Sequence, residues 1–132
     1  MYLNSIKKCS KPLPSFIEIV SLGKPKGSEN EQSVVYLLKN QILIPGDTTK
    51  KEEMKWAHRL PKHIRFLILA HHGSNTSTSF QLLRRANFKL AIASARKKRY
   101  GHPHPKVQTR LRRAQVGLLE TEQMGHIYLE LP

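Results

Sequence analysis

An α/β fold, in which helices pack on a mixed sheet, is predicted from the amino-acid sequence by two observations. First, residues 64–70 (IRFLILA) and 88–94 (FKLAIAS) are nearly continuous in apolar residues, as is typical of buried strands. Second, each of these segments is followed by a stretch in which apolar residues recur at helical spacing, so strands and helices alternate through the second half of the chain. In such sheets the loops that follow the strands carry the chemistry.

The first half of the chain is expected to consist mostly of strands and loops. Residues 1–14 form an irregular lead-in, and one domain is expected to extend over 15–132. Strand-like segments are expected at residues 16–20, 33–38 and 41–44. The polar residues 23–32 form a loop after the first of these, and Lys39 and Asn40 join the other two as a hairpin without glycine in its turn.

Three helices are expected between and after these strands. The first starts at Thr49, where Thr49 and Glu52 match a capping box, and it ends before Pro61. The other two cover residues 80–86 and 105–115, and a proline stands at the start of the last one. Helical spacing assigns the inward faces to Met54, Trp56 and Ala57 in the first helix, to Phe80, Leu83 and Ala86 in the second, and to Val107, Leu111 and Ala114 in the third. Two further short strands are expected to close the chain, at residues 118–120 and 126–131.

The charge of the chain is strongly positive and unevenly distributed. Among 132 residues there are 23 Lys and Arg against nine Asp and Glu, which gives a net charge of +14. Residues 54–119 contain no acidic residue but fifteen Lys and Arg, eight of them between Arg96 and Arg113. Such a balance favours a polyanionic partner, namely nucleic acid, a ribosome or an anionic membrane. A solvated basic face is the alternative.

Two classes of protein are excluded by composition. No apolar run approaches the ~18 residues that a bilayer-spanning helix requires, so the chain is expected to be soluble and to carry no membrane segment. Cys9 is the only cysteine, which excludes an internal disulfide and a zinc finger with several cysteine ligands.

Two histidines and the sole aspartate follow predicted strands. Asp47 comes directly after the strand at 41–44, where its carboxylate could ligate a metal ion or cap the next helix. His71 and His72 come after the strand at 64–70, and imidazole is a common metal ligand. Because adjacent residues on a strand point to opposite faces, one histidine is expected to share a site with Asp47 and the other to be held by a hydrogen bond. A polar turn with one buried histidine is the alternative.

Hydroxyl groups and a basic loop complete the candidate site. Ser74, Thr76 and Ser77 lie where a helix begins, an arrangement that can hold a phosphate group, with an ordinary Ser/Thr cap as the alternative.

The basic loop runs from Tyr100 to Pro105 (YGHPHP). In this loop His102 or His104 could donate to a phosphate or protonate a leaving group. Arg99 and its basic neighbours would attract a polyanion, and Tyr100 could stack on a base. A rigid loop with exposed histidines is the alternative.

Taken together, these loops resemble one family. Pro45-Gly46-Asp47, His71-His72-Gly73-Ser74-Asn75-Thr76-Ser77 and Tyr100-Gly101-His102-Pro103-His104-Pro105 look like the metallo-β-lactamase-fold domain of ComEC-type competence proteins, over about residues 16–131. The resemblance implies hydrolysis of phosphodiester bonds in the DNA strand that is not taken up, by a domain attached to an inner-membrane channel. It also implies a pair of divalent metal ions, zinc or manganese, with Asp47 as the bridging carboxylate. One of His71 and His72 would be a ligand, with His71 favoured, and His102 would contact the substrate phosphate.

The chain departs from the family pattern in its first half. The ligand motif H-x-[HD]-x-D-H is absent, so the resemblance implies half of an αββα sandwich, with metal weakly bound or absent in this chain alone. Another polypeptide segment would supply the missing half, and the apolar sheet face left bare would favour self-association. The expected function is the C-terminal portion of a nuclease-type hydrolase acting on single-stranded DNA in competence. A catalytically silent nucleic-acid-binding remnant that uses residues 54–119 is the alternative.

Overall fold

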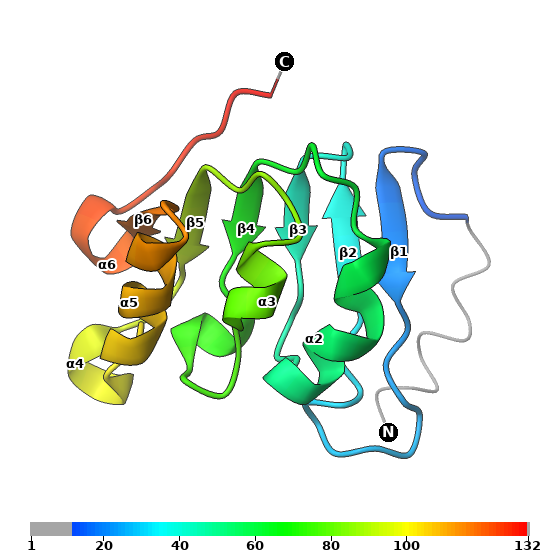
Figure 1. The fold of residues 1–132 in the computed structure, drawn as a ribbon, viewed down its shortest axis with the longest axis horizontal. Helices are drawn as coiled ribbons and strands as arrows, with labels where there is room; N and C mark the ends of the chain where they lie inside the picture. Colours follow the sequence, from blue (N-terminus) through cyan, green and yellow to red (C-terminus); the bar gives the residue numbers. More distant parts are fainter. Residues whose placement is uncertain (1–11, 132) are drawn as a thin grey trace.

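One sheet forms the centre of the structure (Figure 1). The computed structural model describes residues 12–131, without the side chain of Lys97. Within this range six strands lie side by side in the order of the sequence: β1 (Ile17–Ser21), β2 (Val35–Leu38), β3 (Ile42–Ile44), β4 (Phe66–Ile68), β5 (Leu90–Ala93) and β6 (Gly117–Glu120). Of the predicted lead-in, residues 1–11 lie outside the described residues, and residues 12–14 contain neither helix nor strand.

The sheet is mixed, as predicted. β1, β2 and β3 pair antiparallel, whereas β3, β4, β5 and β6 pair in parallel. The antiparallel part contains the predicted hairpin, in which residues 39–41 connect β2 to β3. Lys39 and Asn40 form its turn with φ angles of 47° and 55°, closed by the N–H of Gln41, which donates to the carbonyl of Leu38 at 2.9 Å. Two-residue hairpin turns require positive φ, and asparagine tolerates it. The parallel part brings the carboxyl ends of its strands to one edge of the sheet, where loops can build a site.

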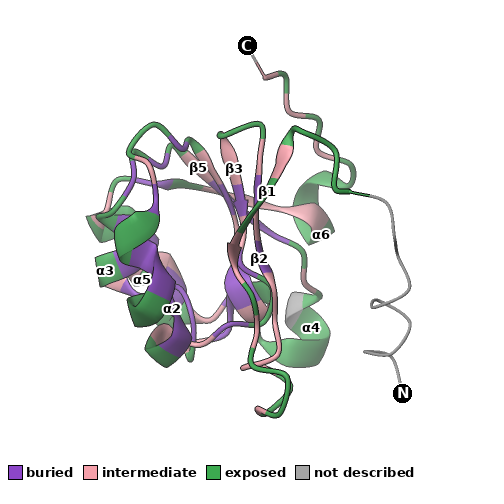
Figure 2. Cartoon of the chain, turned by 90° about the vertical axis from the view of Figure 1, so that its right-hand side faces the viewer, coloured by how far each residue is buried: buried purple, intermediate pink, exposed green. Residues whose placement is uncertain are grey.

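One face of the sheet is covered by a layer of three helices, α2 (Lys50–Trp56), α3 (Phe80–Leu83) and α5 (Pro105–Arg113) (Figures 1 and 2). Leu43, Leu67 and Ala91 lie opposite one another in the strand register and form the core beneath these helices. Trp56 of α2 and Leu111 of α5 pack in the same core and are 1% exposed. Burial of apolar surface stabilises such a layer by roughly 25 cal/mol per Å².

Short helical segments occupy the connections. They are the 3-10 helices η1 (Ala57–Arg59) and η2 (Ala70–Gly73) and the α-helices α4 (Lys97–Tyr100) and α6 (Thr121–Met124). In Figure 2, α4 and α6 lie on the side of the sheet away from α2, α3 and α5. Within residues 12–131, no helix combines the length and apolar character that crossing a bilayer requires.

The opposite face of the sheet is apolar but only partly covered. The register aligns Ile42, Phe66 and Leu90 in one row across the sheet, and all three are half-buried. The apolar run of the central strand is therefore fully covered on the helix side alone. On β4, Leu67 is fully buried against the helices, whereas Phe66 and Ile68 remain partly exposed on the other side.

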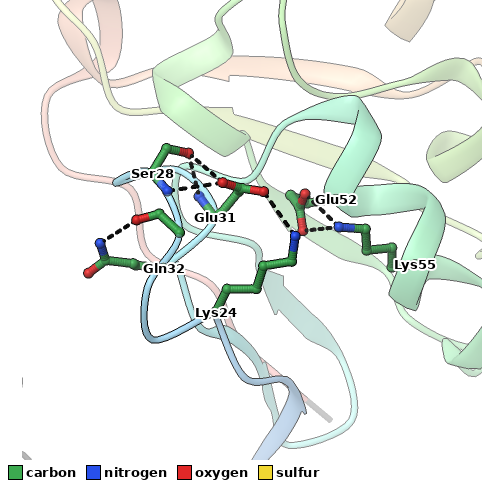
Figure 3. A network of polar contacts seen from close by, with 7 residues as sticks. Lys24, Ser28, Glu31, Gln32, Glu52 and Lys55 are labelled. Atoms are coloured by element: carbon green, nitrogen blue, oxygen red, sulfur yellow. Dashed lines mark hydrogen bonds and ion pairs between the residues drawn. The ribbon is translucent and has the colours of Figure 1, made fainter.

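The polar loop between β1 and β2 is held by one glutamate (Figure 3). Glu31 accepts hydrogen bonds from the backbone N–H and the hydroxyl of Ser28 and pairs with Lys24 at 3.1 Å. These contacts, with the Ser28 N–H first, lower the pKa of Glu31 to about 2. Figure 3 shows the ion pair of Glu52 and Lys55 on α2 next to this network, so the loop lies against the start of the helix layer.

Two details of α2 differ from the prediction. Thr49 occupies the N-cap position, but its side chain accepts no hydrogen bond there. The capping box is therefore wrong, since the carboxylate of Glu52 pairs with Lys55 at 2.8 Å instead of turning back to the helix start. Met54 is 75% exposed and does not face the core, because Glu53 occupies the adjacent inward position and is fully buried.

The strand predicted at 126–131 is wrong. In the described part of the chain, α6 begins at Thr121, directly after β6 ends at Glu120, and Gly125 ends this helix with a φ of 72°. The chain therefore makes no tight turn that would return it along β6. Residues 127–131 continue without helix or strand.

Candidate functional site

Three loops meet at the carboxyl edge of the parallel strands. The loop after β4 is bound to the loop after β3, because the backbone N–H of His71 donates to the carbonyl of Gly46 at 3.0 Å. It is also bound to the loop before α5, because the N–H of His104 donates to the carbonyl of Gly73 at 2.9 Å. Only glycine fits at position 73, where φ is +87° and a Cβ would lie 2.7 Å from the Cβ of Pro103. The loops that the sequence singles out are therefore joined to one another.

A pocket of about 730 Å³ opens at this edge of the sheet. The predicted site residues that line it are His71, His72, Arg99, Tyr100 and His102. Ser94 and Arg96, which follow β5, also line the pocket, as do Thr121 and Glu122, which follow β6. The sequence predicts no site role for Thr121 and Glu122, although their position directly after a strand end is the signal that could have found them.

Both vicinal histidines line this pocket, contrary to the alternation expected of a strand. β4 ends at Ile68, and His71 and His72 adopt left-handed conformations with φ angles of 48° and 55°. Such a conformation costs about 1–3 kcal/mol per residue and persists where the surrounding structure holds it. Strand alternation does not apply to these two residues, so the reason for expecting only one of them in a site shared with Asp47 is wrong, and the shared site itself stays a prediction.

The ring of His72 is oriented by the end of β5. Its Nδ1 lies 2.7 Å from the carbonyl oxygen of Ser94. Because a carbonyl oxygen can only accept, Nδ1 carries the proton in this contact, and Nε2 of the neutral ring is left as an acceptor. A histidine held in this way presents Nε2 to a metal ion or to a proton donor. His72 therefore has the orientation typical of a ligand, and the preference for His71 stays a prediction.

His102 lies edge-on to His71, with ring centroids 6.4 Å apart and planes at 75°. Burial lowers the pKa of His102, and the nearby rings of His71, His72 and His104 lower it further. His102 therefore remains neutral to lower pH than an ordinary histidine does. A neutral ring near physiological pH can accept a proton or a hydrogen bond within the pocket.

The short helix α4 brings a cation and an aromatic ring to the pocket. The guanidinium carbon of Arg99 lies 5.2 Å from the ring centroid of Tyr100, and both side chains are exposed. An aromatic ring of this kind can stack on an unpaired base, and a guanidinium can hold a phosphate. This pair therefore gives the pocket a surface suited to a single nucleic-acid strand.

Asp47 does not belong to the pocket lining. It is exposed, and its backbone N–H donates to the hydroxyl of Ser33 at 3.1 Å. The buried Nδ1 of His71 has no hydrogen-bond partner among the described residues. In the same part of the chain no three His, Cys, Asp or Glu side chains are arranged to hold a metal ion. The described residues therefore hold no complete ligand set, and the pairing of Asp47 with a histidine stays a prediction.

The hydroxyl groups of the loop after β4 hold the loop itself. Ser77 is fully buried, and its hydroxyl donates to the carbonyl of Thr48 at 2.7 Å. The hydroxyls of Ser74 and Thr76 lie 3.0 Å apart. His104 likewise caps α5, since its Nδ1 accepts a backbone N–H of that helix. None of these four predicted substrate contacts lines the pocket, and their contact with substrate stays a prediction.

Two charged residues that the sequence does not assign to the site support the loop from the helix layer. The buried carboxylate of Glu53 accepts the backbone N–H groups of Thr78 and Ser79. Burial raises the pKa of Glu53, while these donors and the charge of Arg110 act in the opposite direction. Arg110 of α5 donates to the carbonyls of Thr78 and Ser77 at 2.8 and 2.9 Å. Glu53 lies three residues before the buried Trp56 and therefore on the same side of α2, and this spacing could have predicted its burial.

Similarity to known proteins extends over most of this chain, although no protein-family model matches it. The chain is 36% identical over 104 residues to Recombination protein 2 of Haemophilus influenzae and 34% identical over 105 residues to ComE operon protein 3 of Bacillus subtilis, each match covering 76% of the chain. It is 37% identical over 95 residues, or 68% of the chain, to Competence protein ComA of Neisseria gonorrhoeae. The chain spans 13% of the length of the first relative and 14% of the other two. Homologues with these names indicate that the chain is related to competence proteins.

Proposed function

We propose that this chain forms the C-terminal portion of a metal-dependent phosphodiester hydrolase that acts on DNA during uptake in competence. A second half, supplied by further polypeptide sequence, would complete the catalytic site. The observation that carries the proposal is the pocket beyond β4 and β5, where imidazole rings lie beside a basic, aromatic helix in a homologue of competence proteins. The names of the relatives support a role in competence, and the chemistry is what the resemblance to the metallo-β-lactamase-fold domain implies.

The proposed architecture is half of a metallo-β-lactamase-type αββα sandwich. This chain supplies one helix layer and one sheet, and the partly covered face of that sheet carries the half-buried row Ile42, Phe66 and Leu90. A second αβ half packed there would remove this apolar surface from water. Without it, the same face favours self-association. By the resemblance, the whole protein would hold this domain next to an inner-membrane channel.

The chain's own residues would hold a DNA strand in the pocket. Arg99 would make charge-assisted hydrogen bonds to a phosphate, and Tyr100 would stack on a base, which is accessible in single-stranded DNA. His102, kept neutral by burial and by its histidine neighbours, would accept or deliver a proton at an oxygen of the phosphate.

The divalent metal, zinc or manganese, would be shared between the two halves. Asp47 and one of His71 and His72 would supply part of the ligand set, and the remaining ligands would come from the H-x-[HD]-x-D-H motif of the second half. The described residues hold no complete set on their own. When bound, such a metal pair activates a water molecule and stabilises charge on the phosphoryl oxygens.

Cleavage of labelled single-stranded DNA tests this function. The chain is assayed alone and together with a segment of a relative that carries the H-x-[HD]-x-D-H motif, with and without manganese or zinc. We expect cleavage only by the pair and only with metal, and we expect Asp47→Ala to abolish it. Glu29→Ala, which removes an exposed carboxylate from the loop between β1 and β2, is the matched control and should cleave normally. No cleavage by the reconstituted pair contradicts the proposal.

Nucleic-acid binding without catalysis is a second candidate function. It is favoured by the stretch 54–119, which contains fifteen Lys and Arg and no acidic residue, and by the absence of the ligand motif. DNA affinity should then fall steeply with salt, and Asp47→Ala should leave it unchanged. Absent or salt-insensitive binding removes this candidate.

A further inference from the structure

A cluster of cations lies on the helix layer, around one aromatic ring. Lys106, Arg110 and Arg113 are spaced i, i+4 and i+7 along α5, so they share one side of this helix over about 10 Å. The guanidinium carbon of Arg113 lies 5.4 Å from the ring centroid of Phe80, at the start of α3. The guanidinium of Arg84, at the end of α3, lies 5.9 Å from the same centroid. Two helices therefore bring their cations together.

Lys50, at the start of α2, extends this cluster. Partial burial lowers the pKa of Lys50, and the positive charges of Arg110 and Lys106 lower it further. The charges are thus close enough to repel one another. The basic ridge is defined here as Lys50, Arg84, Lys106, Arg110 and Arg113, of which Arg110 contributes its charge, since its guanidinium nitrogens already donate to the loop after β4.

In the described part of the chain, no ion pair includes a residue of the basic ridge. The ion pairs found within residues 12–131 are Lys24 with Glu31 and Lys55 with Glu52. Among the described residues, the charge of Glu53 acts on the ridge, where it raises the pKa of Lys50 and Arg110 against the effect of burial. One carboxylate offsets one of five positive charges, and the remaining excess favours an anionic partner.

The ridge lies apart from the pocket. Figure 2 shows α2, α3 and α5 on one side of the sheet, whereas α4 and α6 lie on the other side. No residue of the ridge lines the pocket. The two surfaces approach each other at the loop after β4, which Arg110 holds from the ridge side.

We propose that the basic ridge is a second nucleic-acid site, which binds the sugar–phosphate backbone of a DNA strand outside the pocket. Lys and Arg side chains contact phosphates irrespective of base sequence. An anionic membrane fits this surface less well, because Met54 is the single exposed large apolar side chain among the described residues of α2, α3 and α5, and one such side chain gives little apolar surface to enter a lipid layer. The proposal rests on the proposed function only for its ligand class, DNA.

Anisotropy of a labelled oligodeoxythymidine, measured without metal over a salt series, tests the ridge. The ridge variant combines Arg84→Gln, Lys106→Gln and Arg113→Gln. The control variant combines Arg59→Gln, Lys62→Gln and Arg65→Gln. It also removes two arginines and one lysine, here from exposed positions that precede β4. We expect the ridge variant to bind about tenfold more weakly and to lose about 2 from its salt slope, since each neutralised phosphate of a single strand contributes about 0.7. The control should change the Kd by less than about twofold.

Equal weakening in both variants would overturn the proposal, because net charge alone would then explain binding. Unchanged DNA binding by the ridge variant would overturn it as well. If the ridge variant kept its DNA affinity but lost binding to phosphatidylserine vesicles, the ridge would be a membrane site and the proposal would be overturned. If circular dichroism shows that the ridge variant does not fold, the single variant Lys106→Gln is tested in its place. Its side chain is exposed, and it should weaken DNA binding at least about twofold while Lys62→Gln does not.

The ridge and the hydrolase proposal fail in distinguishable ways. Weakened binding by the ridge variant, together with no cleavage by the reconstituted pair, leaves the ridge in place and rejects the hydrolase. Cleavage that requires Asp47, together with unchanged binding by the ridge variant, rejects the ridge alone.

Discussion

Leu43 and Leu67 are fully buried under the helix layer, whereas Ile42 and Phe66, their neighbours in sequence, are only partly covered on the other face of the sheet. Both faces carry apolar side chains across β3, β4 and β5. The difference lies in the connections, because α2, α3 and α5 all pack on one side. Apolar strands thus indicate which surfaces need burial, and the connecting helices decide which of them the chain buries by itself.

The largest expected loss of stability distinguishes the two faces of the sheet at adjacent positions of β4. Leu67→Ala should lower the free energy of unfolding by about 3 kcal/mol, since a fully buried leucine leaves a cavity in the core. Ile68→Ala should cost only about 1 kcal/mol, because its side chain already contacts water. Denaturant unfolding measures both. Equal losses would mean that both faces are buried to the same degree, for instance by self-association.

Two adjacent glutamates of α2 allow the same comparison of a buried and a more exposed position within the helix layer. Glu53→Ala should cost about 2–3 kcal/mol, because it leaves two buried N–H groups without an acceptor. Glu52→Ala removes a pair with the exposed Lys55 and should cost about 0–1 kcal/mol. If urea midpoints of the two variants coincide, Glu53 does not support the loop after β4.

A smaller effect is expected where the loops of the pocket meet. Gly73→Ala should cost about 1–3 kcal/mol, because it strains a positive φ and forces the new methyl group against Pro103. Gly101→Ala is the control, since its φ is also positive but nothing lies within 4 Å of the added Cβ, so only about 1 kcal/mol is expected. Thermal unfolding measures the difference, and an equal loss would show that the two loops are not in contact.

The smallest effect concerns pH. The pKa of His102 is lowered in the folded state, mainly by burial, so the unfolded chain takes up the proton first. The stability that neutral His102 contributes is therefore present above the unfolded pKa of about 6.5 and is lost as pH falls from there through the folded pKa. His102→Gln should flatten the fall in Tm between about pH 7 and pH 5. If Tm of the variant fell with pH as it does in the unchanged chain, His102 would not be the group responsible for this pH dependence.

Much of the sheet follows from local patterns in the sequence. Alternation and apolar runs predict the strands, and the hairpin forms without glycine because Asn40 accepts a positive φ. The wrong strand at 126–131 has a different cause. Strand propensity does not show whether a segment can return to the sheet and pair with β6, its edge strand. Here α6 starts directly after β6 and leads the chain away from that edge.

The site was predictable to the extent that it depends on strand ends. Parallel pairing brings the loops after β3, β4 and β5 to one edge, and the residues there can be read from the sequence. The left-handed turn at His71 and His72 could not be foreseen, because two consecutive positive φ angles at non-glycine residues depend on tertiary support. Neither could the contacts of Glu53 and Arg110 with residues 77–79, which join positions 25 to 33 residues apart.

The central claim is that the pocket beside α4 receives a single DNA strand, and photo-cross-linking tests it most directly. The full chain is irradiated with single-stranded DNA containing bromodeoxyuridine, and the adducts are mapped by mass spectrometry. Because Tyr100 is exposed and lines the pocket beside Arg99, we expect an adduct on Tyr100 that competitor DNA removes and that Arg99→Gln weakens. Adducts confined to the loop between β1 and β2 or to the partly covered sheet face, with none on α4, would contradict the account.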